Sequence, residues 1–153
     1  MALDMEQKKI RAAAYLGQIR RLNARIKNKL QEKEQIMELA TNVTPTLSDM
    51  PRGSGVADKV GNAGTKLAKV ETEINQIIDQ LIDTRAEIIE LLETLPSDEY
   101  TVLHNFFVLG QTIETIAENM EPREKTARQI YRIKSKGLKH VQAILEQRDQ
   151  IRE

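Results

Sequence analysis

The chain has no cysteine and no tryptophan, and aromatic residues make up only 3% of its 153 residues. Without cysteine, disulfide bonds and thiolate metal sites are excluded. Few aromatic side chains, beside abundant Leu, Ile, Ala, Lys, Glu and Arg, are typical of long helices rather than of a β-sheet. We therefore predict an all-α protein that holds no cofactor and no metal ion.

Long hydrophobic runs are also missing. No stretch approaches the roughly 18 apolar residues that a membrane-spanning helix needs. Residues 1–9 carry charges and lack the apolar centre of a secretory signal. We expect a soluble, cytoplasmic protein that makes no membrane contact.

The net charge is zero, but charges of unlike sign are segregated along the chain. Residues 7–30 hold eight Lys or Arg and no acid, whereas residues 71–99 hold nine Asp or Glu and one basic residue, Arg85. Residues 123–140 are basic again, with seven Lys or Arg and one acid, Glu124. This pattern predicts that particular segments meet partners of opposite charge.

Two long stretches repeat apolar residues every three or four positions, which is the spacing of one face of an α-helix. The first is residues 4–40, and the second, with a nearly unbroken heptad pattern, is residues 56–94. Between them, residues 41–55 contain two prolines and two glycines and should form a loop. We predict an antiparallel helical hairpin, a coiled coil, over residues 1–95.

The charges predict how the two helices of this hairpin are aligned. With the loop centre near residue 50, the basic residues 8–29 lie beside the acidic residues 71–92. Nearer the loop the signs are exchanged, and acids on the first helix face lysines on the second: Glu32, Glu34 and Glu38 opposite Lys59, Lys66 and Lys69. Two helices alone enclose little core. Homodimerisation through the hairpin is therefore as good an interpretation as a purely intramolecular pair.

After Pro96 the chain divides into further helical segments. Ser97 is expected to cap a short apolar helix and Thr112 a second one, because both are good N-cap residues. A third, longer helix should begin at Ala127. Three helices in this order have the outline of a helix-turn-helix, so we predict a small three-helix DNA-binding domain over residues 97–150.

The third helix of this domain has the pattern of a DNA-reading helix. Ile130, Ile133 and Leu138 should face its own domain, which leaves basic and polar residues on the opposite face. Thr126 is expected to cap the N-terminus of this helix. We predict contacts with base edges from Arg128, Gln129, Arg132 and Ser135, with Tyr131 at the margin, and contacts with phosphates from Arg123, Lys125, Lys134, Lys136 and Lys139.

Residues 116–117 (IA) followed by 126–138 (TARQIYRIKSKGL) resemble region 4 of bacterial sigma factors. The chain as a whole is similar to a family of small phage and prophage proteins of Gram-positive bacteria, the sigma-like or ArpU-type late transcription regulators. The matching segments of the hairpin are residues 15–22 (YLGQIRRL), 54–60 (SGVADKV), 73–75 (EIN) and 79–83 (DQLID).

The resemblance implies transcriptional activation, or a related DNA-binding task, for phage or prophage genes. It implies a helix-capping role for Thr126 and places a set of residues on the DNA-facing side: Arg128, Gln129, Tyr131, Arg132 and Ser135. The segment between Ala117 and Thr126 is longer than in the family. Either the turn is enlarged or the recognition helix begins earlier, near Arg123.

Other functions fit the same sequence. A small-terminase-like DNA-packaging adaptor would use the hairpin to build a ring. A protein-binding module would act on RNA polymerase, a repressor or a host defence protein, with the acidic residues 71–99 as its docking surface. The basic third helix could also be only a solvated face, and the basic first helix could serve either its acidic neighbour or DNA.

We expect no enzyme. No Ser/His/Asp arrangement, phosphate-binding glycine loop or metal-binding pattern occurs in the sequence. His104 and His140 belong to separate predicted helices, without a carboxylate pattern nearby. Structural or surface roles are therefore expected for both histidines.

Overall fold

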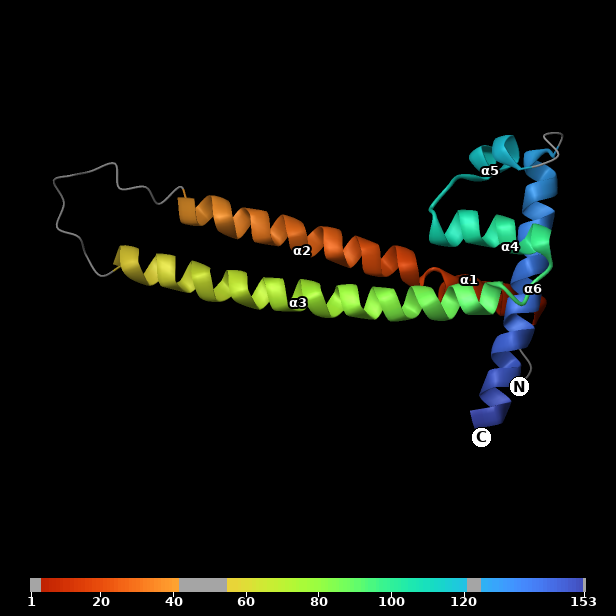
Figure 1. The fold of residues 1–153 in the computed structure, drawn as a ribbon, viewed down its shortest axis with the longest axis horizontal. Coiled ribbons are helices and arrows are strands. Elements are labelled where there is room, and N and C mark those ends of the chain that lie inside the picture. Colours follow the sequence, from red (N-terminus) through yellow and green to blue (C-terminus); the bar gives the residue numbers. More distant parts are fainter. Residues whose placement is uncertain (1–3, 42–54, 121–124, 153) are drawn as a thin grey trace. The chain divides into compact units, whose positions relative to one another are not determined.

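The computed structural model describes residues 4–41, 55–120 and 125–152. Within these ranges the chain forms helices and no β-strand, which confirms the predicted all-α fold. The helices are α1 (Met5–Leu16), α2 (Gln18–Thr41), α3 (Gly55–Leu92), α4 (Ser97–Leu103), the π-helix η1 (His104–Val108), α5 (Ile113–Asn119) and α6 (Ala127–Arg152) (Figure 1). None of these described helices contains an apolar stretch of the length that crossing a bilayer would require.

The first predicted helix is in fact two helices, α1 and α2, which are separated at Gly17. Side chains of α2 bond to carbonyl groups in the last turn of α1: Gln18 Nε2 donates to Tyr15 O at 2.8 Å, and Arg21 Nη2 donates to Ala14 O at 2.8 Å. These bonds satisfy acceptors that a helix end leaves open. Periodicity did not reveal the break, because the apolar spacing continues across it.

The helices group into two compact units, residues 22–81 and residues 1–21 with 82–153. The sequence instead suggested a division between residues 1–95 and 97–150. The grouping differs because α1 packs mainly against α6, and the end of α3 is buried in the same unit as α6. The N-terminal segment therefore belongs with the C-terminal helices.

In the unit of residues 22–81, α2 and α3 run antiparallel (Figure 1). Lys29 Nζ lies 2.6 Å from Glu73 Oε2, and Lys33 Nζ lies 3.1 Å from Glu71 Oε1. The residue number rises along α2, from Lys29 to Lys33, while it falls along α3, from Glu73 to Glu71, as an antiparallel pair requires. Both pairs join a basic residue of α2 to an acid of α3. Lys29 donates a hydrogen bond to the Glu73 carboxylate and so lowers the pKa of Glu73, although burial opposes this shift.

Nearer the loop, ion pairs were expected between acids of α2 and lysines of α3, and none is observed among the described side chains. Glu32 instead pairs with Lys29 of its own helix, at 3.3 Å, because residues three apart on a helix are neighbours. Glu34, Glu38, Lys66 and Lys69 form no ion pair among the described side chains. The side chain of Lys59 lies outside the described part.

The prediction that Ser97 caps α4 is wrong. Pro96 is the N-cap, with φ −55° and ψ 151°, and it makes no side-chain capping bond; Glu99 N instead donates to Asp98 Oδ1 at 2.8 Å. Ser97 is already the first helical residue, and its carbonyl accepts from Thr101 Oγ at 2.9 Å. Proline suits this position because the amide of an N-cap residue has no partner within the helix, so the hydrogen that proline lacks leaves no helical bond unmade.

The segment after α4 widens into η1 and then stops at Gly110. Leu109 N donates to His104 O at 3.1 Å, and Gln111 N donates to Asn105 O at 2.9 Å. Gly110 has φ +72°, the only left-handed backbone among the described residues. That conformation costs other residues roughly 1–2 kcal/mol, so glycine ends the helix and turns the chain towards α5.

A half-buried tyrosine, Tyr15, makes a pH-dependent contact in the unit of residues 1–21 and 82–153. Tyr15 Oη donates to Glu87 Oε1 at 3.0 Å, and Arg148 Nη1 lies 3.6 Å from the same oxygen. Burial, followed by the hydrogen bond to Glu87, raises the pKa of Tyr15 above its ordinary value of 10.0. The folded state therefore holds this proton more tightly. Its stabilisation is present below pH 10 and is lost as pH rises through the folded pKa.

We predict that Tyr15→Phe lowers the free energy of unfolding by about 1 kcal/mol near pH 7, the usual value of one hydrogen bond. As pH rises through the pKa of Tyr15 the difference from wild type should narrow, because the folded state holds the tyrosine proton more tightly than the unfolded chain does. Denaturant unfolding of both proteins at a series of pH values measures the difference. A difference that stays constant from neutral to alkaline pH would contradict the assignment.

Candidate nucleic-acid interface

The N-terminal half of α6 is held against α4 and α5 by one apolar cluster. Its buried members come from all three helices and from the turn after α5: Val102, Ile113, Ile116, Met120 and Ile130. Phe106, Ala117, Ala127 and Ile133 pack against the cluster and are partly buried. Burying one side of α6 in this way leaves its opposite side facing solvent.

A capping box begins α6, with Thr126 as predicted. Gln129 N donates to Thr126 Oγ1 at 3.3 Å, and Thr126 N donates to Gln129 Oε1 at 2.8 Å. Lys125 and Thr126 are not helical, so the alternative that the helix begins near Arg123 is wrong. Gln129, which we had placed on the base-reading side, uses its side-chain oxygen in this cap.

The exposed side of α6 carries the predicted basic residues. Arg128, Arg132, Lys136 and Lys139 are exposed, and Ser135 is half-buried. At about 100° per residue, Arg128, Arg132, Ser135 and Lys139 lie within about 60° of one another around the helix. None of these residues forms an ion pair with another described residue. Their charges are therefore available to a partner.

Lys134 does not belong to this face, although we had assigned it a phosphate contact. Its ammonium group lies 4.0 Å from the centre of the Phe106 ring and 5.8 Å from that of Phe107. The Arg20 guanidinium lies 4.7 Å from the centre of the Phe106 ring, and Arg20 Nη2 donates to Phe106 O at 3.1 Å. Burial lowers the pKa of Lys134, and the nearby Arg20 lowers it further. Lys134 thus contributes a cation–π contact within the unit.

The remaining predicted residues lie at the two margins. Tyr131 is 53% exposed and, with Ser135, lines a shallow hollow between α6 and α1. Lys125 is half-buried just before the cap. Arg123 lies outside the described residues.

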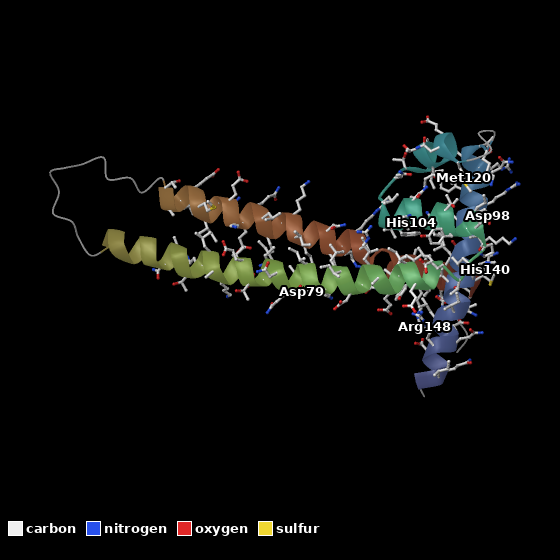
Figure 2. All side chains as sticks on the ribbon, viewed as in Figure 1. Asp79, Asp98, His104, Met120, His140 and Arg148 are labelled. Carbon is white, nitrogen blue, oxygen red and sulfur yellow. The ribbon has the colours of Figure 1, made fainter. Side chains whose placement is uncertain are left out.

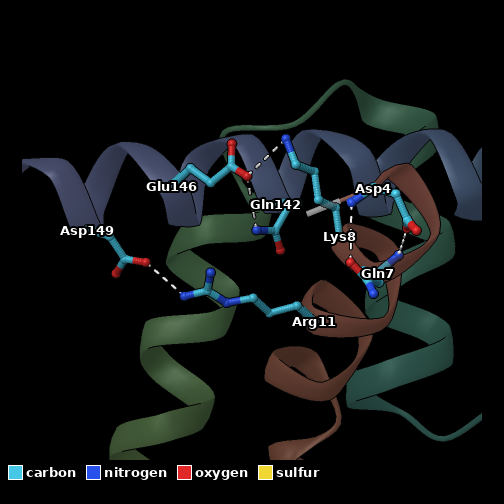
Figure 3. A network of polar contacts seen from close by, with 7 residues as sticks. All are labelled: Asp4, Gln7, Lys8, Arg11, Gln142, Glu146 and Asp149. Carbon is cyan, nitrogen blue, oxygen red and sulfur yellow. Dashed lines mark hydrogen bonds and ion pairs between the residues drawn. The ribbon is translucent and has the colours of Figure 1, made fainter. Parts of the chain in front are cut away.

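The packing of α1 on α6 was not anticipated. Lys8 Nζ lies 3.3 Å from Glu146 Oε1, and Arg11 Nη2 lies 2.8 Å from Asp149 Oδ2 (Figure 3). Gln142, only 2% exposed, donates from Nε2 to Glu146 at 3.4 Å. The hydrogen bond from Gln142 lowers the pKa of Glu146, and the bond from Lys8 lowers it further.

A sequence signal for this contact exists. Both helices repeat a charge at a spacing of three, with basic Lys8 and Arg11 on α1 and acidic Glu146 and Asp149 on α6. Side chains three apart share a helix face, so the two pairs could have been matched. The acidic stretch at residues 71–99 was the more conspicuous partner for the basic first helix.

Glu99 of α4 pairs with His140 of α6, the residue labelled in Figure 2. The Glu99 carboxylate is 2% exposed and meets His140 Nδ1. The histidine was expected to be structural or on the surface, without a carboxylate pattern nearby. Their pairing shows why a carboxylate can be buried here, because buried charges need a hydrogen-bonded partner.

No protein-family model, curated protein or solved structure matches the chain. In the ranges that the structure describes, no group of three histidine or acidic side chains is placed to hold a metal ion.

The close contact of α6 with α4 depends on Gly137. A Cβ atom at this position would lie 2.9 Å from Leu103 Cδ1 and 3.5 Å from Glu99 Cβ. Gly64 lies in the first third of α3, and a Cβ atom added there would meet no atom within 4 Å. The two glycines therefore make a matched pair in helix interiors.

We predict that Gly137→Gln destabilises the protein by about 1–3 kcal/mol, the usual cost of overpacking. Gly64→Gln should stabilise it by about 0.5–1 kcal/mol, because glutamine is the better helix former. Denaturant unfolding followed by circular dichroism gives both values. Equal effects of the two substitutions would show that α4 and α6 are not closely packed at Gly137.

Proposed function

We propose that this chain binds double-stranded DNA sequence-specifically through the exposed face of α6 and regulates transcription by doing so. The supporting observation is that Arg128, Arg132 and Lys139 share one solvent-facing side of a helix whose other side is anchored in the core. Arginine can donate two hydrogen bonds to one guanine, and lysine neutralises phosphate. Ser135 and Lys136, beside them, can bond to a base edge or a phosphate.

We further propose a bacterial cytoplasmic setting and phage or prophage genes as targets. The support is the resemblance of residues 126–138 to sigma factor region 4 and of the whole chain to ArpU-type regulators. The same resemblance favours activation of transcription, for which RNA polymerase would be a second partner.

We predict that selection from a random duplex library enriches a discrete sequence, and that Arg128→Ala with Arg132→Ala lowers affinity for it. Each base contact contributes about 1–3 kcal/mol, so the loss should reach at least about tenfold. Arg25→Ala with Lys27→Ala is the matched control, because it removes two exposed basic residues of α2 and should change affinity little. Gel shifts on the enriched sequence measure all three proteins.

Two results would direct the proposal elsewhere. Binding that is equally strong for all three proteins would mean that α6 does not read DNA. Absence of DNA binding, with retained binding of RNA polymerase or another protein, would favour the protein-binding module. Multi-angle light scattering addresses the third candidate, since a ring of many subunits is expected of a packaging adaptor and not of a regulator.

We propose that the unit of residues 22–81 pairs with a second copy of itself. Leu30 on α2 and Ile78 on α3 are 49% and 36% exposed, and each lies eight residues after a buried residue, Leu22 and Val70. Eight residues turn a helix by about 80°. Because the helices are antiparallel, equal turns bring both side chains to the same side of the pair. Two helices bury little by themselves, and a second pair would cover this apolar side.

We predict a dimer in light scattering and a monomer for Leu30→Glu with Ile78→Glu. Leu39→Glu serves as the control, because Leu39 is 68% exposed but lies about 100° from Leu22 in the opposite sense around α2. The control should remain dimeric. A wild-type monomer at high concentration, or dissociation caused by the control alone, would refute this interface.

A further inference from the structure

The basic charges of α1 lie next to α6, because α1 crosses that helix within one compact unit. Lys9, Ile10 and Glu6 line a hollow of about 300 Å³ together with Tyr131 and Ser135. On the other flank of α1, Met5 and Lys8 line a smaller hollow with Lys139. The first two turns of α1 thus border the face that carries the free basic residues of α6.

The three basic residues of α1 are not equivalent. Lys8 and Arg11 are engaged by Glu146 and Asp149, as Figure 3 shows. Lys9 forms no ion pair among the described side chains, and it is half-buried, with its chain along the hollow beside Tyr131 and Ser135. A lysine stem that packs on its neighbours while its ammonium group stays in water is well placed to meet an anion.

We infer that α1 is a second DNA-contacting element, with Lys9 neutralising a phosphate beside the bases that α6 reads. This inference rests on the proposed function. The inference requires that the side of α6 nearest α1 faces one DNA strand when the protein binds. In that orientation Lys9, Tyr131 and Ser135, which line one hollow, all face that strand. Glu6 lines the same hollow and opposes the contact, so within one turn of α1 Lys9 strengthens binding and Glu6 weakens it.

The test uses three single substitutions in the full chain, with the DNA sequence that selection enriches. For Lys9→Gln, the ratio of affinities at 50 and 200 mM salt should fall by about threefold, because one phosphate contact contributes a slope near 0.9. Glu6→Gln should raise affinity, since it removes a negative charge near the same phosphate. Lys27→Gln, an exposed lysine of the other compact unit, should leave affinity and salt dependence unchanged.

The outcomes separate this inference from the function on which it rests. If the wild-type chain binds no duplex DNA, the proposed function itself fails. If it binds DNA and Lys9→Gln behaves as Lys27→Gln does, α1 is not a DNA contact although α6 still is. Circular dichroism of the Lys9→Gln protein should match wild type, because Lys9 takes part in no described ion pair. Affinity lowered only together with lost helicity would also overturn the inference.

Discussion

Burial of one side of α6 is the constraint on which the candidate interface depends. α1, α4 and α5 all pack against this helix, and Ile130 and Val141 are fully buried in the contacts. A helix with one side committed to a core must present the other side to solvent. The basic residues of α6 are therefore displayed by the same packing that stabilises the unit, and damage to the core would displace them.

Basic residues have two different roles in this protein of zero net charge. Lys8, Arg11, Lys29 and Lys33 are engaged by carboxylates of neighbouring helices, and each exposed pair contributes only about 0.2–1 kcal/mol. Such pairs matter more for orienting helices than for stability. The basic residues on the outer side of α6 have no such partner among the described residues. A protein of zero net charge therefore carries unpaired positive charge on this face of α6.

Local rules predicted the site best where few alternatives compete. Thr126 caps α6 because a threonine before a helix can satisfy an open amide group within its own turn. The same rule misplaced the cap of α4, where Pro96 precedes the serine. It also missed that Gln129 would complete the box. The sequence did not show that Lys134 contacts the Phe106 ring, because Phe106 belongs to η1, far from Lys134 along the chain.

The sequence by itself determined the all-helical fold, the position of α5 and α6 and, apart from Lys134, which basic residues of α6 face outward. Periodicity and capping depend on residues at most four apart, so they can be read from a linear string. Only the tertiary structure decided that α1 leaves α2 at Gly17 and packs on α6. That contact joins residues as far apart as Arg11 and Asp149, 138 positions along the chain. Which of several oppositely charged segments meet is a property of the packed core, since short exposed ion pairs are too weak to select a partner alone.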